Sequence, residues 1–119
     1  MIEKNILAVA TCDLKSQPNL IVVTSRKVVG KDKILITDNC FIKTRKNLLE
    51  NSKIALAVCS KDEEEAYQFK GTAQYLTQGK WKKMVDEDPQ NKDWPHKAAV
   101  LVTVNEIWDL AKSKLISKK

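Results

Sequence analysis

The sequence of 119 residues has few of the residue types on which many functional sites depend. Histidine occurs once, at His96, so neither a Ser-His-Asp triad nor a histidine-rich metal site is supported, and we expect no metal site. The three cysteines, Cys12, Cys40 and Cys59, are odd in number and widely spaced, which excludes a disulfide framework and zinc-finger spacing. Each cysteine is expected to pack as a small buried or half-buried residue.

Long apolar runs are also missing. No stretch approaches the ~20 residues needed to span a bilayer, and the start from Met1 to Ile6 lacks the layout of a signal peptide. We therefore expect a cytoplasmic protein with no membrane partner. The length and the 43% apolar content are typical of one folded domain.

Basic residues outnumber acidic ones by 21 to 15, which gives a formal net charge of +6. An excess of this size indicates an anionic partner, such as nucleic acid, an acidic surface or a phosphate-bearing ligand. Aromatic residues make up only 6% of the chain and do not alternate with Lys and Arg along one strand, as a base-stacking surface would require. A nucleic-acid-binding domain is therefore the alternative and not the first hypothesis.

Short runs of apolar and β-branched residues, separated by polar turns, predict about six strands, at 6–11, 20–24, 34–37, 54–59, 67–76 and 98–104. The run from Leu20 to Thr24 is almost wholly apolar, so we expect it to be buried on both faces. A polar break at Asn105 and Glu106 separates the last strand from a further short run at 107–110. Because the first connections look like hairpins, the pattern favours a mainly β protein, a β-barrel with short helices, over alternating βαβ units.

Two short helices are expected between the strands. The first is predicted from Asp38 or Asn39, both good N-cap residues, to Asn51. The second has apolar residues at helical spacing between a candidate cap, Thr77, and Pro89. We assign residues 1–111 to the barrel domain and 112–119 to a mobile basic tail.

The segment that follows the strand at 34–37 is the most informative for function. A strand ends there in polar residues and leads into a helix start with Lys43, Thr44, Arg45 and Lys46. Free backbone N–H groups, the positive end of a helix and basic side chains together form a phosphate site. The alternative is a basic helix face that is merely solvated.

The order of these segments resembles the pyridoxamine 5′-phosphate oxidase-related FMN-binding split-barrel family, and most of all its small bacterial FMN-binding proteins. The likeness rests on the Lys43-Thr44 pair, on Phe69-Lys70-Gly71-Thr72-Ala73 and on Val102-Thr103-Val104-Asn105-Glu106-Ile107-Trp108, and it spans roughly residues 5–110. It implies a six-stranded antiparallel, Greek-key-like split barrel, an FMN cofactor, and a homodimer with FMN at the subunit interface.

The resemblance also implies which residues contact FMN. The strand at 19–24 and the residue after it would line the flavin, largely through backbone groups, and the end of the strand at 34–37 would touch the flavin and its ribityl chain. The Lys-Thr pair would hold the phosphate, and a tryptophan would lie against the flavin of the neighbouring subunit. The implied contacts are Val22, Val23, Thr24, Ser25, Ile36, Thr37, Lys43, Thr44, Asn47 and Trp94.

The sequence departs from the true pyridoxamine phosphate oxidases at several positions. Asn19, Thr24 and Ala66 stand where those enzymes have an FMN-contacting Arg, Lys and Gln, and their C-terminal substrate-binding segment has no counterpart here. We therefore expect electron transfer or another flavin-dependent oxidoreduction and not vitamin B6 oxidation. Related families bind deazaflavin F420 or heme, although heme has little support because His96 is the single histidine.

No residue is identified as a general acid or base, so the sequence assigns no catalytic residue. The alternative function is a basic single-domain binding protein for nucleic acid, or for another small ligand after loss of flavin.

Overall fold

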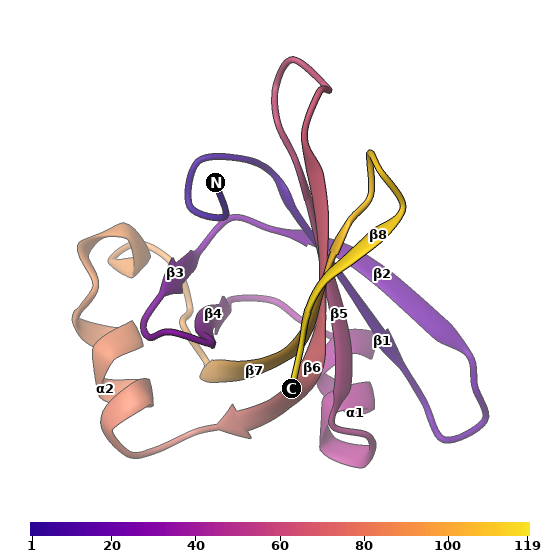
Figure 1. Ribbon diagram of the computed structural model, residues 1–119. Helices are drawn as coiled ribbons and strands as arrows, with labels where there is room; N and C mark the ends of the chain where they lie inside the picture. Colours follow the sequence, from indigo (N-terminus) through magenta and orange to yellow (C-terminus); the bar gives the residue numbers. More distant parts are fainter.

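The computed structural model describes all 119 residues, and its strands form one antiparallel sheet that curls into a half-open barrel (Figure 1). The strands are β1 (Leu7–Cys12), β2 (Pro18–Val23), β3 (Arg26–Val28), β4 (Lys33–Asp38), β5 (Lys53–Cys59), β6 (Ala66–Leu76), β7 (Ala98–Asp109) and β8 (Lys114–Lys118). Two helices, α1 (Lys43–Glu50) and α2 (Lys80–Glu87), and a 3-10 turn, η1 (Pro89–Asn91), complete the chain. The strand order is β2-β1-β5-β6-β7-β4-β3, and β8 pairs with β7. The expected mainly β, split-barrel class is confirmed. The sheet has eight strands where six were expected, because the short β3 and the C-terminal β8 were not predicted.

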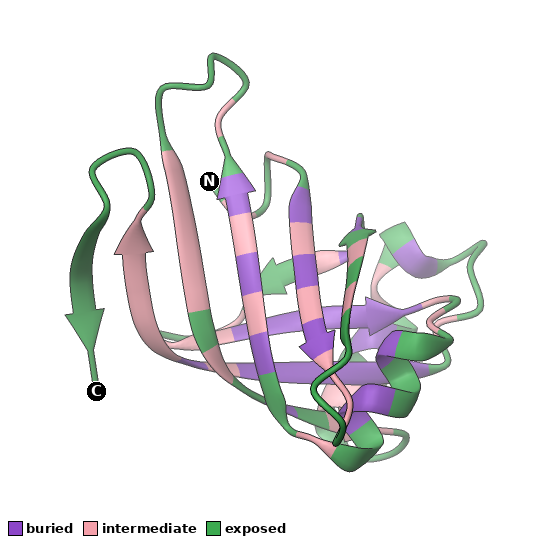
Figure 2. Ribbon diagram, turned by 90° about the vertical axis from the view of Figure 1, so that its right-hand side faces the viewer, coloured by how far each residue is buried: buried purple, intermediate pink, exposed green.

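Alternating side chains build the core. In β5, Ile54, Leu56 and Val58 are buried while Ala55 and Ala57 point outward, and Figure 2 shows this alternation as bands along the strands. The inward residues join a cluster of 13 buried apolar side chains from β1, β2, β4, β5, β6, β7 and α1. A second cluster of four buried residues forms where α2 packs on the sheet. Neither α1 nor α2, each of eight residues, could span a membrane.

Strand β2 is not buried on both faces, contrary to our expectation. Leu20 is 69% and Val22 61% exposed, whereas Val23 is buried. These side chains are exposed because β2 is the end strand of the sheet and no element of the chain covers its outward face. An apolar run in a sequence predicts buried side chains, but here some of these side chains stay exposed in the single chain.

The C-terminal third differs from the expectation in two ways. Strand β7 runs unbroken from Ala98 to Asp109, because Asn105 and Glu106 stay within it and Glu106 pairs with Lys70 on one side and Lys118 on the other. The expected mobile tail contains β8, whose side chains are all exposed but whose backbone is paired with β7.

Gly71 allows β6 and β7 to stay paired along their full length. The register shifts between Lys70 and Gly71, which marks a β-bulge. A Cβ at Gly71 would lie 1.9 Å from the carbonyl oxygen of Thr103. Only glycine therefore fits this close approach of two backbones.

Both helices begin later than predicted. Asp38 lies within β4, and its carboxylate accepts hydrogen bonds from the backbone N–H of Phe41 (2.8 Å) and the hydroxyl of Tyr75, so it stabilises the turn before α1 and does not cap it. Helix α2 follows Gly79, whose φ of +95° is favourable for glycine, and Thr77 is not its cap. Two of the cysteines, Cys40 and Cys59, are exposed and not packed inside as expected.

Candidate functional site

The free edge of β2 is the first component of the site. Strand β2 pairs only with β1, so the backbone groups on its other edge have no strand partner. Val22 points outward and is exposed, Val23 points into the core, and Thr24 is exposed after the strand ends. This segment therefore offers backbone donors and acceptors beside one exposed apolar side chain, as the expected flavin-lining role requires.

A buried polar network joins the end of β2 to β4 and η1. The Ser25 hydroxyl donates to Asn91 Oδ1 (2.5 Å) and lies 2.8 Å from Thr37 Oγ1, while Asn91 Nδ2 donates to Thr37 Oγ1 (3.2 Å) and to the carbonyl of Val85 (2.9 Å). The Ser25 and Thr37 hydroxyls are therefore engaged within the protein, and these residues fix the backbone of the site. Ile36 is also buried, with its side chain in the core.

Asn91 was not identified from the sequence. Asn91 lies 66 residues from Ser25 in the chain, and no local sequence pattern predicts the hydrogen bond between them. Its place two residues after the turn-forming Pro89 is the one local feature in the sequence, and its burial is visible only in the fold.

The start of α1 is the second component. Lys43 is exposed and forms no ion pair, and the first turn of α1 has neither an acidic residue nor a side-chain cap. The first helical hydrogen bond is from Lys46 N to Ile42 O, which leaves the N–H groups of the three preceding residues without a helical partner. A free ammonium group next to free amides at the positive end of a helix fits a phosphate monoester.

Thr44 and Asn47 place this helix start against the β1–β2 hairpin. The Asn19 side chain donates to Thr44 Oγ1 (3.1 Å), and the Asn47 side chain donates to Thr11 Oγ1 (3.0 Å). Both helix residues are buried, so their polar groups attach α1 to β1 and β2. The structure thereby brings the predicted phosphate site next to the predicted flavin strand.

The positive charge of Lys43 acts on Asp13, an acidic residue of the same hairpin. The pKa of Asp13, in the turn after β1, is lowered mainly by the backbone N–H of Gln17, and the positive charge of Lys43 lowers it further. Lys43 lies four residues before Asn47 on the same face of α1, and Asn47 bonds to Thr11 of this hairpin.

The opposite flank of α1 holds a different cluster. The Arg45 guanidinium lies 5.7 Å from the ring centroid of Tyr75, whose hydroxyl donates to the buried Asp38. Burial, together with the hydrogen bond to Asp38, raises the pKa of Tyr75 to about 12, so this phenol stays protonated at neutral pH. The cluster fastens β6 to the β4–α1 turn.

Trp94 lies in the loop between η1 and β7, and its side chain is 59% exposed. Two hydrogen bonds hold this loop at the β4–α1 turn, from His96 N to Asn39 Oδ1 (2.9 Å) and from Lys97 N to the carbonyl of Asp38 (2.7 Å). An exposed indole on an anchored loop is available to another molecule.

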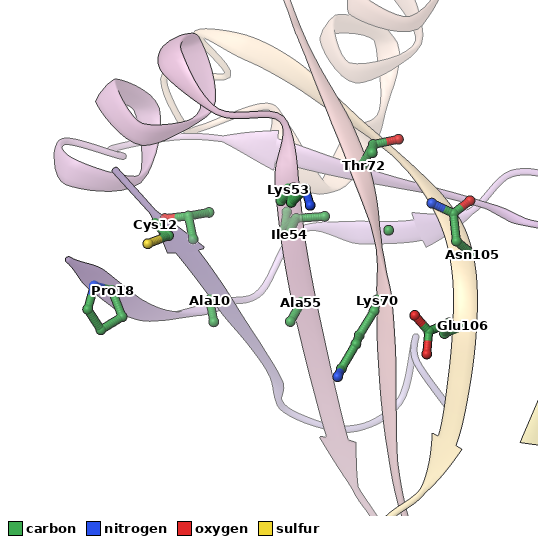
Figure 3. Close-up of a pocket in the computed structure, with 12 residues that line it drawn as sticks. Ala10, Cys12, Pro18, Lys53, Ile54, Ala55, Lys70, Thr72, Asn105 and Glu106 are labelled. Carbon is green, nitrogen blue, oxygen red and sulfur yellow. The ribbon is translucent and has the colours of Figure 1, made fainter. Parts of the chain in front are cut away.

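The outer face of the sheet is lined by small side chains. Along neighbouring strands, Leu20, Ala10, Ala55 and Lys70 form one cross-strand row. Figure 3 shows residues that line the resulting hollow, among them Ala10, Ala55, Lys53, Lys70 and Glu106, and the volume of the hollow is about 480 Å³.

Comparison with known proteins gives one consistent family. A family model described as pyridoxamine 5′-phosphate oxidase matches residues 2–111. An uncharacterized protein of Methanocaldococcus jannaschii is 35% identical over 125 residues, which cover 98% of this chain and 83% of the relative.

Solved structures share the fold. HupZ from Group A Streptococcus superposes with a TM-score of 0.90 at 27% identity, covering 98% of this chain and 93% of that one. An FMN-binding protein from Syntrophomonas wolfei gives a TM-score of 0.72 at 20% identity, covering 87% and 76%. The same fold occurs in an F420 reductase and in a heme-binding protein from Mycobacterium smegmatis, so the fold alone does not select one cofactor.

Proposed function

Because the chain belongs to the pyridoxamine 5′-phosphate oxidase family, we propose that it binds FMN as a homodimer and takes part in electron transfer or another flavin-dependent oxidoreduction. The observation that carries this proposal is the free ammonium of Lys43 at the start of α1, where helix amides are unpaired and Thr44 bonds to Asn19 of the end strand β2. When bound, FMN supplies the redox chemistry. The chain's own residues bind the cofactor, orient it and set its surroundings.

In this proposal the phosphate is bound by Lys43 and the first-turn amides of α1. FMN phosphate is close to the dianion at neutral pH, and a charge-assisted hydrogen bond is about twice as strong as a neutral one. Asn19, which replaces an arginine of the oxidases, bonds to Thr44 and adds no charge. In this proposal Lys43 supplies the positive side-chain charge that meets the phosphate.

The flavin ring is assigned to the free edge of β2, from Val22 to Ser25. The backbone there would pair with the polar edge of the ring, and Val22 would contact its apolar part. Ser25 and Thr37 would act through Asn91, which keeps the backbone of this segment in place. Trp94, exposed and anchored, would meet the ring bound mainly by the partner copy.

FMN content is the direct test of this function. We expect the purified protein to be yellow and to release FMN on denaturation, which mass spectrometry of the released chromophore would identify. Release of heme or F420 would refute FMN as the cofactor, and a colourless protein that fails to take up added FMN would refute flavin binding altogether.

The outer face of the sheet supports the homodimer. Alanines on β1 and β5 permit close approach of another surface, and Leu20 and Val22 beside them are exposed apolar side chains that one chain leaves uncovered. A second copy would bury all of them, and a face made of the same residues on both partners is self-complementary by symmetry.

Ala10→Glu tests this interface. The longer, charged side chain would block the close approach that Ala10 permits and would have to be desolvated in the dimer, so we expect the dimer dissociation constant to rise by about a hundredfold or more. Sedimentation velocity at micromolar concentration would show a monomer for Ala10→Glu and a dimer for the wild type. Ser52→Glu, which adds the same charge at an exposed turn outside this face, should stay dimeric. A monomeric wild type would contradict the interface.

A further inference from the structure

A second cavity lies between the β3–β4 turn, the first residues of the chain and strands β6, β7 and β8. Its volume is about 330 Å³. It shares no residue with the proposed FMN site or with the outer-face hollow except Asn105, which borders both cavities. Its apolar lining consists of Ile2, Val28, Ile34, Phe69, Val104 and Ile107.

The floor of this cavity is part of the hydrophobic core. Ile34 and Val104 are 2% and 7% exposed, and the half-buried Phe69 and Ile107 pack against the same core cluster. The cavity therefore opens directly onto core side chains, and its size falls at the lower end of the range for small-molecule sites.

The mouth of the cavity has an excess of positive charge. Asp32 accepts from Lys33 Nζ (3.1 Å) and from Lys119 Nζ, and Lys31 forms no ion pair. The hydrogen bond from Lys119, followed by that from Lys33, lowers the pKa of Asp32 to about 2, so this carboxyl group is ionised at neutral pH. Three lysines and Asp32 thus line an apolar opening, and the Glu3 carboxylate lies beside it, bonded to the backbone N–H of Val28 (2.8 Å), which leaves one excess positive charge.

Strand β8 supplies one wall. Ser117 pairs with Ile107, and Lys119 donates its backbone N–H to the carbonyl of Asn105 (2.9 Å). The basic C-terminal segment, whose side chains make no contribution to the core, is held by these bonds at the rim of the cavity.

We propose that this cavity binds a small organic carboxylate with an apolar body, whose hydrocarbon or aromatic part lies on Ile34, Phe69 and Val104. Its carboxylate is met by Lys31, with Lys33 and Lys119 adding positive charge at the mouth. The proposal does not depend on FMN binding, because the two sites have no residue in common.

Two-dimensional NMR of the full-length, ¹⁵N-labelled protein tests the site, with 1-naphthoate as the probe and 1-naphthalenemethanol as its neutral analogue. Amide shifts should concentrate around Ile34, Phe69 and Val104, and they should persist when FMN is added in excess. Because an exposed ion pair contributes up to about 1 kcal/mol, the carboxylate should bind about fivefold more tightly than the alcohol.

Two matched variants test whether Lys31 binds the carboxylate of the probe. Lys31→Glu should weaken 1-naphthoate binding about fivefold or more, because a repulsive carboxylate replaces the unpaired ammonium. Lys27→Glu, on the same hairpin but outside the cavity, should bind like the wild type. The proposal is overturned by no shift at millimolar probe, by shifts elsewhere, by displacement with FMN, by equal affinity for the alcohol, or by equal effects of the two variants.

Discussion

Lys43→Glu should lower the affinity for FMN by about a hundredfold, because it removes a charge-assisted hydrogen bond and adds repulsion, together about 2.7 kcal/mol. The first turn of α1 contains no other acidic residue, so the new carboxylate would be the first negative charge among the free amides. Quenching of flavin fluorescence on titration of the apoprotein would measure the dissociation constant. The fold should be unaffected, since the Lys43 side chain is exposed and unpaired.

Lys46→Glu is the matched control for this prediction. It changes the same charge on the same helix, but the Lys46 amide already bonds to Ile42 O and its side chain is exposed beyond the first turn. We expect its FMN affinity to stay within about threefold of the wild type, as for a screened surface charge. Equal losses in both variants would indicate a general electrostatic effect, and an unchanged affinity in Lys43→Glu would refute the phosphate assignment.

Gly71→Ala should lower the free energy of unfolding by about 3 kcal/mol, which is large for the addition of one methyl group. The added Cβ would lie 1.9 Å from the Thr103 carbonyl oxygen, and the obstacle is backbone that cannot rotate away. The bulge would have to open and separate β6 from β7, the two strands at the centre of the sheet. Urea unfolding at one fixed protein concentration would measure the change, since a dimer makes stability concentration-dependent.

Gly30→Ala provides the control. A Cβ there meets only the Lys33 side chain, at 3.5 Å, which is ordinary contact. We expect no loss of stability, or a gain of up to about 1 kcal/mol, because alanine restricts the unfolded chain. A loss in Gly71→Ala no larger than the change in Gly30→Ala would show that the bulge is not constrained as described.

The sequence was sufficient to locate most strands, because alternating and β-branched runs such as 54–59 reflect local burial. It could not show that β7 continues through Asn105 and Glu106. Those polar residues are tolerated because Asn105 is the extra residue of a bulge in β7, with its carbonyl bonded to Lys119 N, and Glu106 pairs with both β6 and β8. These are long-range features. For the same reason β8 itself was missed, since its pairing is entirely backbone and its side chains are exposed.

In the candidate site too, local features could be predicted from the sequence and long-range contacts could not. Lys43 follows from a local pattern, a polar strand end before a basic helix start. The hydrogen bonds of Ser25 and Thr37 with Asn91 could not be predicted from a local pattern, because they join residues 54 to 66 positions apart. The family resemblance implied that both residues contact FMN, which stays a prediction, and only the fold shows that their hydroxyls are hydrogen-bonded within the protein.

The open edge of β2 also has a consequence for the life of the protein in the cell. An end strand with unpaired backbone groups, next to exposed Leu20 and Val22, is a surface on which newly made chains can pair wrongly. A bound ligand and a second copy would both cover that surface. The supply of cofactor would then act as a folding factor, so that chains made without it are the ones exposed to aggregation and proteolysis.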